Sequence, residues 1–427
     1  MSSRVVVTGI GLVTPIGRTV DAVFEALCAG TSGLRRPDDP ALAASMCAAG
    51  FGPDIDAASV IPKREARTVD RYVVNAIAAA DDAIADAGLV VGRDVDPYRV
   101  GAIVSGTGGL ATLEAQVVIR TERGRLSVSP FLLPGMLPNM GTARIAIKHG
   151  VMGYTSSIGT ACAAGAQSIG EAVRLLRAGD ADVVICGCSE APLFPTLADT
   201  FAHTQALARD WADPTIASRP FDRRRNGMVL SEGAGVFVLE RADHADARGV
   251  AGYADVAGWG MTTDAHHTTT PRPDGSAAAE CMRRSLADAR VSAADIGYVN
   301  AHATSTKLGD VAESRAIQAV FSDSGPPVSS CKAVTGHMLG ASGVVEAAAT
   351  VTAMLRGQLP PTHNLDDPDP ACDLDHIRKV PRPADIEYAV SNSFGFGGHN
   401  VSLVFGRPST REVRTHEGKV GNDHPRH

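Results

Sequence analysis

The sequence lacks the features of a membrane or nucleic-acid-binding protein. It has no uninterrupted apolar run approaching the ~20 residues that a membrane-spanning helix needs. The apolar run in its opening segment, MSSRVVVTGIGLVTPIG, is too short for a signal peptide, and no cleavage-type pattern follows. Basic residues are not in excess, since 40 Lys and Arg stand against 47 Asp and Glu for a net charge of -7. We therefore expect no membrane insertion and no nucleic-acid partner.

Cysteines in disulfide-type spacing are also missing. The eight cysteines are scattered, and Cys186 and Cys188 form only a CxC inside the apolar run ADVVICGCSEA. That run is typical of a buried strand, and no second cysteine pair accompanies it to complete a zinc-type ligand set. We expect no metal site, and we expect the protein to work in the reducing cytoplasm.

Short β-branched runs alternate with amphipathic stretches along the chain. Strands are predicted at 4–11, 99–106, 182–187, 233–240, 296–302, 387–393 and 400–406, and helices at 74–89, 166–179, 276–291 and 344–358. In the helix over 166–179, Ile169, Val173 and Leu176 share one face. The alternation predicts an α/β fold with largely buried sheets.

The order of these segments indicates two similar halves. The first, residues 1–250, places Cys162 before a helix, and the second, 251–410, places His302 at the end of a strand. The tail 411–427 is polar and lacks periodicity, so we expect it to be disordered.

Four stretches combine reactive side chains with small or turn-forming neighbours. They are TACAAG with Cys162, NAHATSTKLGD with His302, SCKAVTGHMLGASGVVE with Lys332, His337 and Glu346, and SNSFGFGGHN with Phe394 and Phe396. All fall where strand-like and helix-like segments meet, the positions at which α/β folds build sites.

Cys162 has two interpretations. At a helix start, free backbone N–H groups and the helix dipole would favour the thiolate and lower the pKa of the thiol. A buried cysteine is more commonly a small hydrophobic packing residue. The histidines and the lysine have equally plain interpretations as strand-end or surface residues. Taken together, cysteine plus histidine indicates covalent acyl chemistry, without separating hydrolysis from carbon–carbon bond formation.

At these residues the sequence resembles the β-ketoacyl synthases, the condensing enzymes of fatty acid and polyketide synthesis. The motifs VVVTGIGLVTPIG, SPFLLPGMLPNM, TACAAG, GDADVVICGCSEA, ASRPFDRRRNGMVLSEGAGVFVLE, GYVNAHATSTKLGD, KAVTGHMLGASGVVEA, LPPTHNLDDPDP and SNSFGFGGHN occur in the family's order. The resemblance runs from Arg4 to about Arg407 and is nearest to the elongating synthase II type. It implies a thiolase-like fold with a five-layered α-β-α-β-α core.

The resemblance also implies residue roles. Cys162 would carry the acyl chain as a thioester, while His302 and His337 would bind the malonyl thioester and promote its decarboxylation. Lys332 would balance charge near His337. Backbone N–H groups of Cys162 and Phe396 would form the oxyanion hole. The remaining assignments are a loop-fixing role for Glu346, a gate at Phe396 supported by Phe394, and hydrogen bonds to the pantetheine arm from Thr304, Thr306 and Thr269.

Two kinds of departure accompany the resemblance. Ala303 stands where glycine is usual, and Lys307 where proline is common. Thr107 matches a position that lines the acyl pocket and often carries an apolar side chain, so its hydroxyl indicates an unusual acyl chain.

The implied partners are an acyl carrier protein and a second subunit. Lys63, Arg64, Arg67 and Arg71 fall within a little over two turns of an expected helix and would form a cationic docking patch for the acidic carrier; a solvated helix face is the alternative. Family members dimerise, so we expect a homodimer or a heterodimer with a homologous chain-length-factor-like subunit. No cofactor is expected on this chain, because the phosphopantetheine arrives on the carrier protein.

Two other kinds of protein share the implied fold. A chain-length-factor-like partner would be catalytically silent and would lack the nucleophile, and a thiolase would use a second cysteine as its base. The presence of Cys162, His302 and His337 favours the synthase.

Overall fold

A computed structural model describes residues 4–321 and 325–408 of the chain. The tail 411–427, which the sequence predicts to be disordered, lies outside the described residues.

The first half of the chain contributes five strands to the main sheet. They are β1 (Val5–Val13), β4 (Val100–Ser105), β5 (Thr155–Ser156), β6 (Val183–Glu190) and β7 (Gly233–Arg241). They lie in the order β1-β7-β6-β4-β5. Strand β7 is antiparallel to both β1 and β6, whereas β4 is parallel to β6 and β5.

The second half repeats this arrangement. Its strands are β8 (Ala254–Thr263), β9 (Ile296–Asn300), β10 (Val328–Ser329), β13 (Tyr388–Gly395) and β14 (His399–Gly406). Their order is β8-β14-β13-β9-β10, with the same pattern of antiparallel and parallel neighbours. Pairing of Val6 with Asp255 joins β1 to β8, so the two halves form one continuous ten-stranded sheet.

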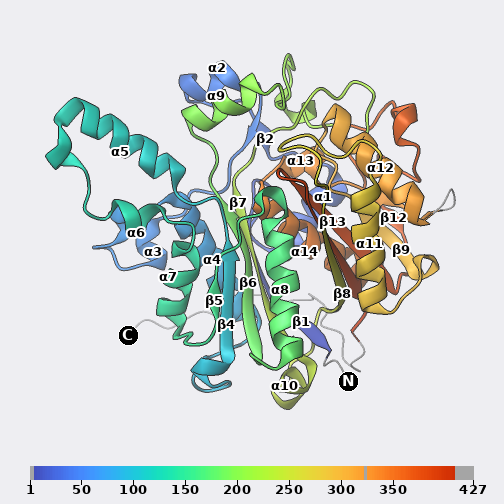
Figure 1. Cartoon of the computed structure of the whole chain (residues 1–427), viewed down its shortest axis with the longest axis horizontal. Helices are drawn as coiled ribbons and strands as arrows, with labels where there is room; N and C mark the ends of the chain where they lie inside the picture. The colour runs from blue at the N-terminus through green and yellow to red at the C-terminus, as the bar shows by residue number, and fades with distance from the viewer. Residues whose placement is uncertain (1–3, 322–324, 409–427) are drawn as a thin grey trace.

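Helices cover and separate the two halves of the sheet (Figure 1). In the first half, α4 (Arg71–Asp86) and α7 (Met140–His149) pack on the outer face, and in the second half α11 (Ser276–Ala289) and α12 (Lys307–Phe321) do so. Helices α8 (Ala164–Ala178) and α14 (Gly340–Arg356) lie between the halves and contact strands of both. The predicted α/β class and the five layers are confirmed.

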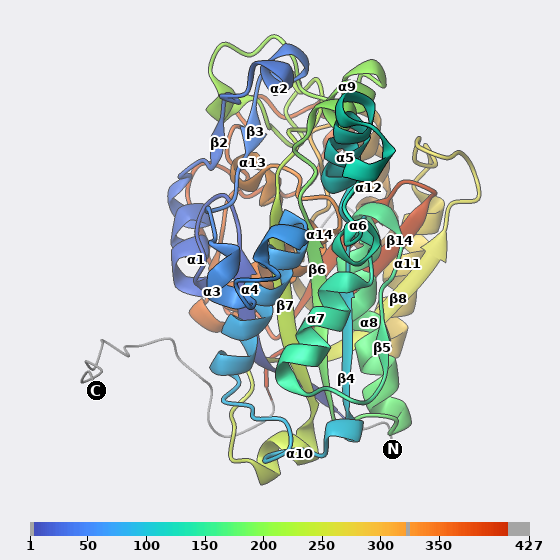
Figure 2. The ribbon, with the colours of Figure 1, turned by 90° about the vertical axis from the view of Figure 1, so that its left-hand side faces the viewer.

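Shorter elements complete the chain. The remaining helices are α1 (Val20–Ala29), α2 (Pro40–Ser45), α3 (Ala57–Val60), α5 (Leu110–Arg123), α6 (Leu132–Met136), α9 (Pro195–His203), α10 (Ala242–Ala247) and α13 (Lys332–Thr335). Two small antiparallel sheets of two strands each pair β2 (Leu34–Arg35) with β3 (Ala49–Gly50) and β11 (Gln358–Leu359) with β12 (Arg382–Pro383). Helix α5 stands out from the body of the molecule at the left of Figure 1, and Figure 2 shows this side of the molecule face on.

The central helices are packed by small residues. Helix α14 is buried on every side from Gly340 to Met354, as expected for a core helix rather than an amphipathic surface helix. A Cβ added at Gly165 of α8 would lie 2.3 Å from the carbonyl oxygen of Gly340. Any larger residue at position 165 would therefore push the two helices apart. This close approach brings the N-terminal ends of α8 and α14 together, which is where the reactive residues lie.

Ile169, Val173 and Leu176 are fully buried, as the helical pattern predicts. All seven predicted strands are present. The pattern missed β8 and the two-residue strands β2, β3, β5, β10, β11 and β12, and it gave no signal for α12. Among the described residues, no helix is both long enough and apolar enough to cross a bilayer. The eight cysteines carry free thiols.

Candidate active site

Cys162 lies in a short 3-10 turn, Ala161–Ala163, that leads directly into α8. Ala161 has a φ of 48°, a left-handed conformation that is unfavourable for alanine. Gly395 approaches this turn so closely that an added Cβ would lie 3.2 Å from the backbone nitrogen of Cys162. The bend and this contact hold the thiol of Cys162 at the end of the helix, facing the turn between β13 and β14.

Cys162 is only 8% exposed. Because of this burial, the prediction of a lowered thiol pKa is wrong. Burial, reinforced by the carboxylate of Glu190, raises the pKa of Cys162 to about 12. Lys332 and the backbone N–H groups of Phe396 and Cys162 oppose the shift but do not reverse it. The helix start favours a thiolate, but loss of solvation outweighs it.

His337 is the direct partner of the thiol. Its Nε2 atom lies 3.1 Å from Cys162 Sγ, and its Nδ1 atom lies 3.2 Å from Ser342 Oγ. The hydroxyl of Ser342 also accepts a hydrogen bond of 2.9 Å from the Met338 backbone N–H. Burial and Lys332 hold the pKa of His337 well below its usual value. A neutral ring that donates from Nδ1 to Ser342 leaves Nε2 free to accept the thiol proton.

His302 follows strand β9, and its ring faces that of His337. Its ring centroid is 5.4 Å from that of His337, with the rings nearly perpendicular, and 5.7 Å from that of Phe394. The backbone N–H of His302 donates to Glu313 Oε1 over 2.8 Å, which fixes the chain where it leaves the strand. Burial, Lys332 and His337 all lower the pKa of His302. Its Nδ1 atom is buried without a hydrogen-bond partner among the described residues.

Lys332 and Glu346 form a fully buried ion pair behind the histidines. Both side chains are 1% exposed, and Lys332 Nζ donates to Glu346 Oε1. Burial raises the pKa of the Glu346 carboxyl, and the ammonium of Lys332 opposes that shift. The pair joins α13 to α14, the two helices that flank His337 in sequence.

A cavity of about 380 Å³ brings these groups together. Its lining includes Cys162, His302, His337, Phe394, Phe396, Thr269, Thr304 and Thr306. The hydroxyls of Thr304 and Thr306 lie 3.1 Å apart. The ring of Phe396 packs 6.3 Å from that of Phe201, and Lys307 is an exposed part of the lining. The cavity thus runs from surface residues to the buried thiol.

Thr107 is not part of this lining. Its hydroxyl donates to Glu190 Oε2 over 2.6 Å, and its backbone N–H contacts the same oxygen. Burial raises the pKa of Glu190 to about 7. The Thr107 hydroxyl is therefore engaged by a buried carboxyl, and its effect on acyl-chain choice stays a prediction.

The prediction that Lys63, Arg64, Arg67 and Arg71 lie on one helix is wrong. Residues 61–70 form turns with a single 3-10 segment, Ala66–Thr68, and α4 begins only at Arg71. Arg71 is occupied within the fold, since its guanidinium donates to both carboxylate oxygens of Glu232 over 2.8 and 2.9 Å. Lys63, Arg64 and Arg67 are exposed. Only these three remain as candidates for the predicted docking patch.

Sequence reasoning missed three polar residues that support the site. Ser342 orients His337, Glu313 holds the backbone beside His302, and Glu190 raises the pKa of Cys162. Ser342 lies five residues after His337 within a motif already identified, so its position offered a signal. Glu190 and Glu313 gave none, because only the fold places them beside the reactive groups.

The fold and this geometry define a class: a condensing-type acyltransferase built from two similar halves, with a cysteine and two histidines at one buried point. Residues 2–245 match the family described as Beta-ketoacyl synthase, N-terminal domain, and residues 253–366 match Beta-ketoacyl synthase, C-terminal domain. The chain belongs to the β-ketoacyl synthase family.

Curated relatives agree with this assignment. The chain is 42% identical over 407 residues to the 3-oxoacyl-[acyl-carrier-protein] synthase 2 of Vibrio harveyi, covering 94% of this chain and 98% of the relative. It is 42% identical over 411 residues to the same-named enzyme of a Synechocystis species, covering 94% and 97%.

Solved structures share the fold. A β-ketoacyl synthase from Burkholderia phymatum is similar with a TM-score of 0.88 and 35% identity, over 95% of this chain and 99% of that one. A type II polyketide ketosynthase solved with its acyl-carrier protein has a TM-score of 0.88 and 32% identity, over 95% and 100%. The predictions of the family, the fold and acyltransferase activity are confirmed.

Proposed function

We propose that this chain is an elongating β-ketoacyl-[acyl-carrier-protein] synthase in which Cys162 carries the growing acyl chain and His302 and His337 act on the malonyl unit. The 3.1 Å contact between Cys162 Sγ and His337 Nε2 carries the proposal. Both groups lie at the buried part of a cavity whose lining also includes exposed residues such as Lys307. The wider family resemblance supports the same assignment.

The first step is transfer of the acyl group to Cys162. As Sγ attacks the thioester carbonyl, the thiol proton moves to His337 Nε2, and the same proton then passes to the departing thiol of the carrier. Burial raises the thiol pKa and lowers the imidazole pKa, so the pair rests in its neutral form. The base is needed because little free thiolate is available at neutral pH.

The second step is decarboxylative condensation. His302 and His337 donate hydrogen bonds to the carbonyl oxygen of the malonyl thioester, which stabilise the enolate that forms as CO2 leaves. For this step His337 carries its proton on Nε2 and accepts a hydrogen bond from the Ser342 hydroxyl at Nδ1. The enolate carbon then attacks the acyl-Cys162 carbonyl, and the Cys162 thiolate departs and takes up one proton, which solvent supplies by way of His337 Nε2. Neutral imidazoles suit this role because, in a buried site, they act as donors without requiring the desolvation of a cation.

The backbone around Phe396 supports both steps. The N–H groups of Cys162 and Phe396 face the sulfur, so an oxygen on the attacked carbonyl carbon falls within their reach. These donors are fixed before the reaction and act as negative charge develops. Phe396 is 38% exposed and lines the cavity, which fits a gate that moves when an acyl chain enters, with Phe394 behind it.

Thr269, Thr304 and Thr306 would bind the pantetheine arm, because their side chains lie along the cavity between the surface and the thiol. The arm belongs to the carrier protein, and we propose that the reaction uses no metal or cofactor of the chain's own. The enolate charge is met by imidazole and backbone donors, so the chemistry assigns no step to a metal. The free thiols of all eight cysteines support a reducing, cytoplasmic setting.

A silent chain-length-factor-like role is disfavoured by the intact Cys162–His337 pair. A thiolase role is disfavoured because Cys162 is the only cysteine in the described lining of the cavity. A solved ketosynthase/chain length factor pair is nevertheless similar to this chain at 32% identity with a TM-score of 0.87. The active member of such a pair is the alternative to a homodimer.

We propose instead a homodimer formed through the face that carries α5, α6 and β5. Apolar side chains on this face are exposed: Val117 by 55%, Val118 by 47%, Leu126 by 91%, Phe131 by 55% and Leu133 by 61%. Strand β5 is the edge of the sheet. An edge strand can pair with its own copy across a twofold axis, which would cover both the edge and the apolar face.

The proposed function is tested by incubating the purified protein with acyl-carrier proteins loaded with saturated and unsaturated chains, then adding malonyl-carrier protein. The expected products are a 3-ketoacyl thioester two carbons longer and one CO2. The preferred chain would separate a fatty acid substrate from a polyketide one. Release of free acid without elongation would contradict the proposal.

A further inference from the structure

The loop that carries Thr304 and Thr306 has an unfavourable backbone. Ser305, between them, has a φ of 69°, in the left-handed region that non-glycine residues rarely adopt. The loop is also short, because strand β9 ends at Asn300 and helix α12 begins at Lys307. A strained conformation of this kind persists only when surrounding contacts hold it.

Those contacts come from the segment 219–227, which lies before β7 in the first half of the chain. Arg225 donates from Nε to the carbonyl oxygen of Thr306 over 3.1 Å and from Nη2 to that of Lys307 over 3.0 Å. The Gly227 backbone N–H donates to the carbonyl oxygen of Ser305 over 3.1 Å. Three consecutive carbonyl groups are thus fixed by one segment.

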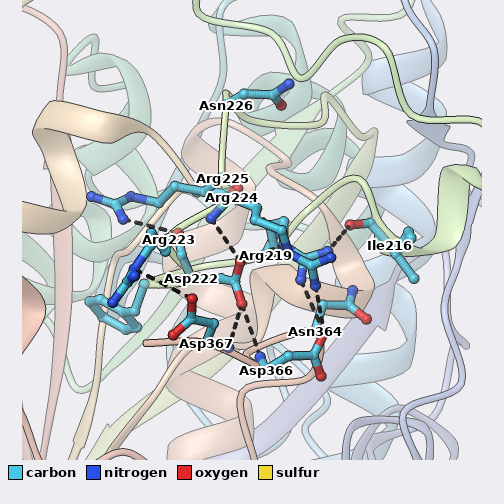
Figure 3. A network of polar contacts seen from close by, with 12 residues as sticks. Ile216, Arg219, Asp222, Arg223, Arg224, Arg225, Asn226, Asn364, Asp366 and Asp367 are labelled. Carbon is cyan, nitrogen blue, oxygen red and sulfur yellow. Dashed lines mark hydrogen bonds and ion pairs between the residues drawn. The ribbon is translucent and has the colours of Figure 1, made fainter. Parts of the chain in front are cut away.

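Arg225 is itself rigidly held. Its side chain is 1% exposed, and it donates from Nη1 to Asp369 Oδ2 over 2.7 Å, while Nε lies 3.5 Å from Asp310 Oδ2. Asp310 is fully buried on α12, immediately after the loop. Around Arg225 lies a wider network centred on Asp222, which accepts hydrogen bonds from Arg219 and from the backbone of Asp366 and Asp367 (Figure 3).

Arg225 does not line the cavity, but its neighbours on both sides of these contacts do. Asn226 and Gly227 line it from the Arg225 segment, and Thr304, Thr306 and Lys307 line it from the loop. Cys162 and His337 receive no contact from Arg225. The guanidinium can therefore affect the reaction only through the shape of the loop.

We propose that Arg225 is a positioning residue that holds the 304–307 loop in the conformation that presents the Thr304 and Thr306 hydroxyls to the pantetheine arm. The inference rests on the proposed function, in which those hydroxyls bind the arm. A lysine at position 225 keeps the charge but cannot reproduce the planar fork that reaches two adjacent carbonyls. Arg225 thus governs binding of arm-borne substrates, whereas Cys162 and His337 govern the chemistry.

The test compares Arg225→Lys with the wild-type enzyme in the condensation reaction. The KM for malonyl-carrier protein should rise about tenfold while kcat stays within about twofold, because binding contacts weaken and the reacting groups do not move. The rate of Cys162 alkylation by iodoacetamide, which has no arm, should be unchanged. A kcat loss equal to the kcat/KM loss, or slowed alkylation, would show a general structural defect and overturn the proposal.

Arg224→Met provides the matched control. Arg224 belongs to the same segment and contacts Asp222 and Asp366, but it is 56% exposed and does not touch the loop. Its KM should stay at the wild-type value. A double substitution, Arg225→Lys with Thr306→Val, should cost less than the sum of the two single changes, because both act on the same contact; full additivity would contradict the inference.

Failure of the inference is distinguishable from failure of the proposed function. If the wild-type enzyme does not elongate any loaded carrier protein, the proposed function fails. If the wild-type enzyme elongates and Arg225→Lys has an unchanged KM, only the role of Arg225 is lost.

Discussion

The Nε2 atom of His337 lies 3.1 Å from the Sγ atom of Cys162, although the two residues are 175 positions apart in the chain. The repeat of strand order in the two halves produces this contact, because it brings the start of α8 and the start of α14 to the same place between the two halves of the sheet. Burial shifts the pKa values of the two groups in opposite directions, toward thiol and neutral imidazole. In this site the thiol proton is therefore transferred to His337 during the attack, and Cys162 is not a thiolate beforehand.

The pH dependence of Cys162 alkylation follows from this neutral pair. A thiol whose pKa is raised to about 12 has a thiolate fraction that grows with pH throughout the neutral and mildly alkaline range. The iodoacetamide rate at Cys162 should thus rise about tenfold per pH unit from about pH 7 to about pH 10. N-acetylcysteine, measured alongside, should level off above its own, lower pKa. A plateau for Cys162 below about pH 8 would indicate a preformed thiolate–imidazolium pair instead.

Substitution of the two histidines should separate the two half-reactions. His337→Asn removes the base that contacts Cys162 and should slow acylation of the thiol by at least about 100-fold. His302→Asn should leave acylation within about threefold and reduce malonyl decarboxylation, because its ring faces His337 rather than the sulfur. Stopped-flow release of the carrier thiol and release of labelled CO2 measure the two steps.

An exposed histidine gives the control for these variants. His203→Asn, at the end of α9, should change neither rate. Equal losses of acylation in His302→Asn and His337→Asn would contradict the division of roles.

The buried ion pair of Lys332 and Glu346 should be costly to break. Lys332→Met leaves a fully buried carboxyl group without its partner, and the free energy of unfolding should fall by about 3–5 kcal/mol. The double variant Lys332→Met with Glu346→Met should lose much less than the two single variants combined. Urea denaturation measures all three.

The exposed pair of Arg284 and Glu280 on α11 is the comparison, with side chains 60% and 47% exposed. Arg284→Met should change the free energy of unfolding by less than about 1 kcal/mol. A Lys332→Met variant that is no less stable than Arg284→Met would show that the buried pair has no stabilising role.

Charged substitutions on the apolar face formed by α5 and the turn after it should separate the two subunits of the proposed homodimer. Val117→Glu combined with Leu126→Glu places two charges on this face and should give monomers at micromolar concentration in light scattering after gel filtration. Val380→Glu introduces a charge at another exposed apolar residue, which is 68% exposed, and should leave the dimer intact. A monomeric wild-type chain that forms a complex only with a homologous subunit would favour the heterodimer.

Local patterns predicted much of the fold and the identity of the reactive residues. Cys162, His302, His337 and Lys332 stand in distinctive motifs with small neighbours, so they could be selected before their contacts were known. Strands β5 and β10, with two residues each, are too short to show any periodicity. Their positions depend on pairing with β4 and β9 rather than on their own residues.

Electrostatic environments could not be predicted in the same way. The pKa of Cys162 depends on burial by both halves of the molecule and on Glu190. The position of Cys162 at a helix start alone predicted a lowered pKa, which is the wrong direction. The sequence pattern indicated that Arg71 was a free cation, because its partner Glu232 is 161 positions away in the chain. Thr107 likewise meets Glu190 only through the pairing of β4 with β6.

The central claim is that Cys162 carries the acyl chain and that His337 takes its proton during transfer. Peptide mass spectrometry after brief exposure to acyl-carrier protein tests it most directly. We predict a single acyl adduct on the peptide containing Cys162, a much slower appearance of this adduct in His337→Asn, and its loss when malonyl-carrier protein is added. An adduct on another residue, or elongation at the wild-type rate in Cys162→Ala, would contradict the account.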